Sequence, residues 1–227
     1  MKKILAVTFF FLLALISIAQ DRKTFVSVHG GVNFSNITVG GTSFTDWKNR
    51  TGICAGLGFG YKAAKKILLL VEANYDQKGY RNEYTITDEK GMDMGKAYAN
   101  NYSDYLSVPI IINYTSKGEN TFEAGIGIIN NFLLSADIMT PPNQGGFPPN
   151  SEINYKELYK GYELDFTIRV GGSIKIASQL NLLLEGRISN GLTSFSKSDE
   201  VKSIHNTMFL GTGVRYYFNE KKEEEIK

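Results

Sequence analysis

Residues 102–114 read Tyr-Ser-Asp-Tyr-Leu-Ser-Val-Pro-Ile-Ile-Ile-Asn-Tyr, and polarity alternates along most of this stretch. The even positions from Leu106 to Ile112 are aliphatic, with Tyr102 and Tyr114 at the two ends, whereas most odd positions are polar. A period of two is typical of a β-strand whose two faces meet different surroundings. At about 3.3 Å per residue and a tilt of about 40°, this stretch rises roughly 30 Å, the thickness of a bilayer's hydrocarbon layer.

The same alternation recurs along the rest of the chain. Counting residues 102–114, the sequence predicts eight strands, near 24–34, 51–61, 67–77, 102–114, 122–134, 163–175, 180–190 and 208–218. The 13 Tyr and 14 Phe residues favour strands. No segment after the N-terminal one approaches 20 consecutive apolar residues, so we expect no membrane-spanning helix there.

Four features indicate that the aliphatic face points towards lipid and the polar face into a narrow barrel. Glycines crowd the polar face, as in residues 56–60, and a narrow lumen requires small residues. Aromatic residues end the aliphatic face, as at a membrane interface. An even strand number returns both chain ends to one side. The predicted connections also alternate between short (62–66, 115–121, 176–179) and long (35–50, 78–101, 135–162, 191–207).

Closure of the barrel follows from the membrane environment. In lipid, an open sheet edge would leave backbone groups unpaired at several kcal/mol each, so the first strand must pair with the eighth. We therefore predict an all-β fold, an eight-stranded antiparallel up-and-down transmembrane β-barrel. Alternation alone leaves one rival open, a soluble periplasmic barrel with an apolar lumen that binds an apolar ligand.

The N-terminus predicts export. Two lysines precede an apolar run from Ile4 to Ala19, with small residues Ser17 and Ala19 before a cut. This is the layout of a signal peptide, cleaved near Ala19. We therefore expect a signal peptide over 1–19, an outer-membrane barrel over 20–218 and a charged periplasmic tail over 219–227.

Four stretches resemble the PorT-like outer-membrane β-barrel proteins of Gram-negative bacteria. They are Val71-Glu-Ala-Asn-Tyr-Asp-Gln-Lys-Gly79, Asp104-Tyr-Leu-Ser-Val-Pro-Ile-Ile-Ile-Asn-Tyr114, Glu185-Gly-Arg-Ile-Ser-Asn-Gly-Leu-Thr193 and Gly211-Thr-Gly-Val-Arg-Tyr-Tyr-Phe218. The resemblance covers essentially the mature chain, and none of its motifs is catalytic. It implies an eight-stranded outer-membrane barrel and, from the family's namesake, a part in protein secretion.

Charged residues on the polar faces are predicted to fill the lumen. Eight strands enclose a space just wide enough for side chains, and buried charges must pair. We expect an internal ion-pair network of His29, Glu72, Asp76, Glu123, Asp165, Arg169, Lys175, Glu185, Arg187 and Arg215. A proton or ion path along these residues is the alternative. We predict that Lys175 pairs with Gln179, which places Arg169 opposite Glu185, because a slip of two would place Arg169 opposite Arg187, a like-charge contact in a poorly solvated lumen.

Catalytic and cofactor motifs are absent from the sequence. There is no Walker loop, dinucleotide fingerprint or HExxH motif, and no basic cluster suited to nucleic acid. The lone Cys54 excludes an internal disulfide and a cysteine metal cluster, and we expect no cofactor and no metal. His29 and His205 are the only candidates for acid–base work near neutral pH. A Ser and a carboxylate beside either histidine would favour the rival function, a lipid-modifying barrel enzyme.

The long connections are the predicted place of function. Exposed aromatic residues on loops are typical binding anchors, and six lie here: Trp47, Tyr80, Tyr84, Tyr98, Phe147 and Tyr159. The alternative is that they pack on one another or extend the strands as hairpins. We expect a monomeric, non-enzymatic barrel in contact with outer-membrane lipid, whose extracellular loops bind a protein or a surface polymer.

Overall fold

The computed structural model describes residues 24–40, 46–88, 90–139, 152–198 and 202–218. The predicted signal peptide and its cleavage site near Ala19, the proline-rich segment 140–150 with Phe147, and the tail 219–227 lie outside the described residues. In the described part of the chain, no helix is long and apolar enough to cross a membrane.

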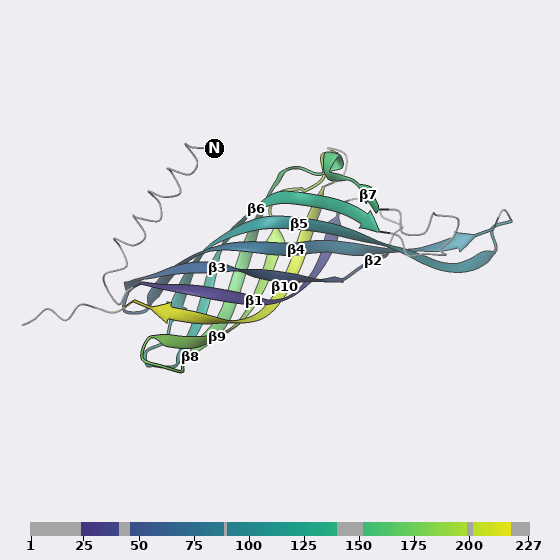
Figure 1. Cartoon of the computed structure of the whole chain (residues 1–227). Helices are drawn as coiled ribbons and strands as arrows, with labels where there is room; N and C mark the ends of the chain where they lie inside the picture. The colour runs from purple at the N-terminus through teal and green to yellow at the C-terminus, as the bar shows by residue number, and fades with distance from the viewer. Residues whose placement is uncertain (1–23, 41–45, 89, 140–151, 199–201, 219–227) are drawn as a thin grey trace, which may run out of the picture.

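Eight long antiparallel strands form a closed barrel (Figure 1), which confirms the predicted fold. They are β1 (Thr24–Val39), β3 (Arg50–Ala64), β4 (Ile67–Thr87), β5 (Asp93–Thr115), β6 (Thr121–Met139), β8 (Tyr162–Lys175), β9 (Leu180–Gly191) and β10 (Ser203–Tyr217). β1 pairs with β10 from Phe25–Tyr217 to Val39–Ser203, and this pairing closes the ring. Two short strands are added at the edges, β2 (Asp46–Lys48) on β4 and β7 (Glu152–Asn154) on β6, and one 3-10 turn, η1 (Lys156–Leu158), follows β7.

Several strands run further towards the long connections than the sequence predicts. The segment predicted as a connection at 78–101 is instead the outer half of β4 and β5, paired from Gly79–Tyr102 to Thr87–Asp93. This hairpin projects well past the other strands (Figure 1). The alternation of apolar and polar residues fades there, because neither face of the hairpin meets the apolar surroundings of the membrane.

The two faces of the barrel are divided as predicted. On β5, Leu106, Ile110 and Ile112 point outward and are 43 %, 46 % and 54 % exposed, whereas Ser107 and Asn113 are buried in the lumen. The aliphatic residues at even positions of β8, β9 and β10 also face outward. An outward aliphatic face around a polar interior is the inverse of a soluble barrel, so the rival with an apolar lumen is wrong.

Two apolar clusters lie at the ends of the polar lumen. The lower cluster, at the end with the short turns, consists of Phe25, Leu68, Leu70 and Ile111, with Tyr217 packed against it. The Phe25 ring lies over β3 at Gly60, where a Cβ atom would overlap it. The upper cluster, at the end with the long connections, consists of Ile37, Tyr105, Leu133, Ala136, Tyr159 and Phe195.

The predicted register between β8 and β9 is wrong by two residues. Lys175 pairs with Asn181, and Arg169 pairs with Arg187, the arrangement that the sequence disfavours. The turn is wider than predicted, because Ile176 N–H donates to the carbonyl of Leu180. Glu185 instead lies opposite Gly171, which has no side chain to occupy the space between Arg169 and Glu185.

Candidate functional site

The lower half of the lumen holds three guanidinium groups among three carboxylates, and Arg169 on β8 is at its centre. Its Nε donates to Glu185 Oε2 at 2.6 Å, and its Nη1 donates to Glu123 Oε2 at 2.8 Å and to Asn113 Oδ1 at 3.1 Å. Arg169 is 0 % exposed. The like charge of the neighbouring Arg187 is offset, because both guanidinium groups reach carboxylates contributed by other strands.

The two other arginines complete this lower network. Arg187 Nη2 donates to Glu72 Oε2 at 2.7 Å across the barrel and lies 3.4 Å from Glu185 Oε1. Arg215 on β10 forms two hydrogen bonds with Glu123. The Arg215 guanidinium carbon also lies 4.0 Å from the centre of the Phe25 ring. These contacts join the network to the lower apolar cluster, and the lower network as a whole is balanced in formal charge.

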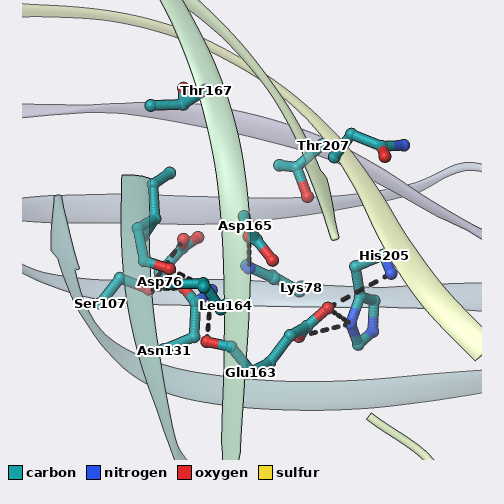
Figure 2. Close-up of polar contacts among 12 residues, drawn as sticks. Asp76, Lys78, Ser107, Asn131, Glu163, Leu164, Asp165, Thr167, His205 and Thr207 are labelled. Carbon is teal, nitrogen blue, oxygen red and sulfur yellow. Dashed lines mark hydrogen bonds and ion pairs between the residues drawn. The ribbon is translucent and has the colours of Figure 1, made fainter. Parts of the chain in front are cut away.

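The upper half of the lumen holds a second set of polar contacts (Figure 2). Lys78 Nζ lies 2.6 Å from Asp165 Oδ2, and His205 Nδ1 lies 2.9 Å from Glu163 Oε2. Asp76 accepts hydrogen bonds from Asn33 and from Ser107 Oγ, the latter at 3.1 Å. These residues are all buried, so ion pairs and hydrogen bonds between buried polar side chains occupy the upper half of the lumen as well as the lower half.

Nine of the ten predicted lumen residues are buried in the barrel: His29, Glu72, Asp76, Glu123, Asp165, Arg169, Glu185, Arg187 and Arg215. Lys175 is not, because it is the last residue of β8 and its side chain reaches Glu119 at the exposed end of the barrel. The prediction omitted Lys78 and Glu163. The sequence predicts a connection at Lys78, but Lys78 lies on the same face of β4 as Asp76. Continuing the period of two from Asp76 would have identified it.

Aromatic side chains cover the upper end of the lumen. The Phe195 ring stacks on His205 with centroids 4.2 Å apart, and Tyr159 stacks on Phe195 at 5.1 Å. The hydroxyl groups of Tyr80 and Tyr159 lie 3.4 Å apart. Burial raises the pKa of the Tyr159 hydroxyl, so this group stays protonated at neutral pH. Tyr80 and Tyr159 therefore pack on one another, the alternative that the sequence left open for the six aromatic candidates.

Three other aromatic candidates lie on or beside the projecting hairpin, and Phe147 is outside the described residues. Tyr84 is in β4, and Trp47 is in β2 opposite Asn82 of β4. Tyr98 in β5 is half-buried, and the guanidinium carbon of Arg81 lies 4.6 Å from the centre of its ring.

The side chains around His205 and His29 show which partners each histidine has. His205 has a carboxylate partner in Glu163, but among the described residues no hydroxyl group reaches its Nε2. Neither ring nitrogen of His29 has a hydrogen-bond partner in the described part of the chain, although its Nε2 lies 3.6 Å from Glu72. In the segments that the structure describes, no serine is hydrogen-bonded to a ring nitrogen of either histidine, as an acyl-transfer mechanism would require.

One buried group has a spacing suited to a metal ion. The ligand atoms of His29, Glu72 and Glu185 all lie within 4.8 Å of one another. Arg187 contacts both carboxylates, and Arg169 contacts Glu185. The two guanidinium groups neutralise these carboxylates and would repel a cation, so the donor set favours internal ion pairing.

Comparisons with known proteins identify a matching family and solved structures of similar fold. Residues 18–197 match the model of a family described as outer membrane protein beta-barrel domain. Similar solved structures include Neisserial surface protein A, with 14 % identity over 86 % of this chain and 97 % of that one and a TM-score of 0.46. OprG of Pseudomonas aeruginosa has 13 % identity over 87 % and 99 % of the two chains and a TM-score of 0.49. Ail of Yersinia pestis has 13 % identity over 86 % and 99 % and a TM-score of 0.43. No curated protein matches the sequence.

Proposed function

The chain belongs to the outer membrane protein beta-barrel domain family, and we propose that it is a non-enzymatic, plugged barrel that presents its projecting hairpin to an extracellular partner. The observation that carries this proposal is the filled lumen. Arg169, Glu123 and Glu185 form a buried ion-paired group, with an apolar cluster at each end of the lumen. A barrel sealed in this way offers its outer segments, rather than its interior, for binding.

We expect the purified barrel to show no open-pore conductance in planar bilayers. Eight strands leave room only for side chains, and moving an ion through would require displacing ion pairs that are held in low-dielectric surroundings. A porin of about 16 strands, reconstituted in the same lipid, is the positive control. Large and steady single-channel currents from the monomer would refute the plugged lumen.

The hairpin of β4 and β5 is the segment best placed to meet a partner. It projects beyond the barrel (Figure 1), and β6 pairs with β5 only from Asn100 onwards. Among the described strands, residues 93–99 therefore pair only with β4, which leaves one edge of β5 open along this segment. An exposed strand edge binds extended peptides by adding a strand. A role beside a protein-secretion machine, which the PorT-like resemblance implies, is one case of this proposal.

Shortening the hairpin is expected to abolish partner binding while the barrel still assembles. The change replaces residues 81–100 with an Asn-Gly turn between Tyr80 and Asn101, a pair that is opposite in the register. Two properties are compared between the shortened and the unchanged barrel. They are the set of partners that cross-link to the barrel at the cell surface, and the heat-modifiable gel mobility, which reports barrel closure.

A control variant replaces only the hairpin turn, residues 88–92, and leaves the strand edge intact. It should retain the partner. If the shortened barrel keeps every cross-linked partner, the hairpin is not the binding segment.

A further inference from the structure

The short turns at the lower end of the barrel are strongly basic. The three turns and the residues that flank them carry five lysines and one acid: Lys62, Lys65, Lys66, Lys117 and Lys175, with Glu119. Lys175 is paired with Glu119. Among the described residues, Lys62, Lys65 and Lys117 have no carboxylate within ion-pair distance, so the three turns themselves carry a net positive charge.

These three lysines surround a groove. The β3–β4 turn and the β5–β6 turn lie side by side, joined by a hydrogen bond from Thr115 N–H to the carbonyl of Lys66. Between them is a groove of about 570 Å³ that Lys62, Lys65 and Lys117 line together with the small residues Ala63, Ala64 and Gly118. Small residues leave the space open, and the lysines give it a positive field.

The groove adjoins the surface that faces lipid. Tyr61, Ile67 and Tyr114 are exposed on the outer wall beside the two turns. Lys66 Nζ lies 5.4 Å from the centre of the Tyr114 ring. Tyrosines at this position mark the boundary between hydrocarbon and headgroups. The lysine groove is therefore level with the phosphates of the adjacent leaflet and continuous with the membrane interface.

We propose that this lysine groove binds the phosphate headgroup of an anionic glycerophospholipid in the leaflet next to the short turns. The three lysine ammonium groups would attract one phosphate electrostatically. The acyl chains of the lipid would lie along Tyr61 and Tyr114. A soluble anion would gain the charge contacts but not the apolar ones. The orientation predicted from the lengths of the connections puts the short turns on the periplasmic side, so the proposed lipid belongs to the periplasmic leaflet.

The test uses native mass spectrometry of the purified full chain with phosphatidylglycerol and with phosphatidylcholine of the same acyl length. We expect preferential retention of phosphatidylglycerol. A triple variant, Lys62→Gln, Lys65→Gln and Lys117→Gln, should lose this preference by about fivefold for each lysine removed. The corresponding three Lys→Arg changes keep the charge and should retain it.

A charge-matched control removes three exposed lysines at the other end, Lys90→Gln, Lys96→Gln and Lys197→Gln. It should leave the preference unchanged, and an equal loss in both triple variants would overturn the proposal. Competition by millimolar inorganic phosphate would also overturn it, since that result indicates a plain anion site. If heat-modifiable gel mobility shows that the first triple variant does not fold, Lys117→Gln alone is compared with the unchanged protein. This single change should lower the preference for phosphatidylglycerol by about fivefold.

Discussion

Replacing Arg169 with methionine is expected to lower the free energy of unfolding by about 3–5 kcal/mol. Arg169 is completely buried and contacts both Glu123 and Glu185. Removing it leaves two carboxylates with less compensation where water cannot replace the lost contacts. Urea unfolding of the barrel refolded into lipid vesicles gives the measurement.

Two further variants separate loss of charge from loss of packing. Lys175→Met removes a cation from the same strand, but its partner Glu119 is exposed, so the expected loss is at most about 1 kcal/mol. Combining Arg169→Met with Glu185→Gln should recover part of the lost stability, because one of the carboxylates that has lost its cation is removed. If Arg169→Met and Lys175→Met have the same effect, the lumen is solvated and the plugged-barrel description fails.

Replacing Ile110 with arginine is expected to cost about 2–4 kcal/mol of barrel stability. Ile110 is 46 % exposed on the outer face of β5, between Val71 of β4 and Ile128 of β6. An arginine there must enter hydrocarbon or distort the bilayer around it. The same vesicle unfolding assay measures the change. Leu182 also faces outward, but it is the third residue of β9 and lies near the short-turn end, so it is the poorer test site.

The control is the same substitution on the same face of β5 at a position nearer the end of the barrel. Tyr114 is on the same strand and the same face as Ile110, but beside the short turn, and Tyr114→Arg should cost about 1 kcal/mol or less. A cost that is equal at the two positions would mean that the outer face of β5 does not cross a hydrocarbon layer.

The architecture follows from the sequence because the contrast between lipid and lumen acts on every residue of a strand. Residues such as Ile110 and Asn113 meet opposite environments, so the alternation identifies the membrane-spanning part of each of the eight long strands and its two faces. Closure then follows from the cost of an open edge in lipid. The same local rule places nine of the ten predicted charges inside the barrel.

The partners of those charges were decided only by the tertiary structure. Arg187 pairs with Glu72, which is 115 residues away in sequence, and Arg169 pairs with Glu123, 46 residues away. The first contact crosses the lumen and the second joins neighbouring strands, so the register of β8 against β9 depends on carboxylates from β4 and β6 as well as on the pair itself. That is why Arg169 can lie opposite Arg187. Alternation within a strand reports the environment of each residue, whereas pairing across a barrel depends on the whole closed ring.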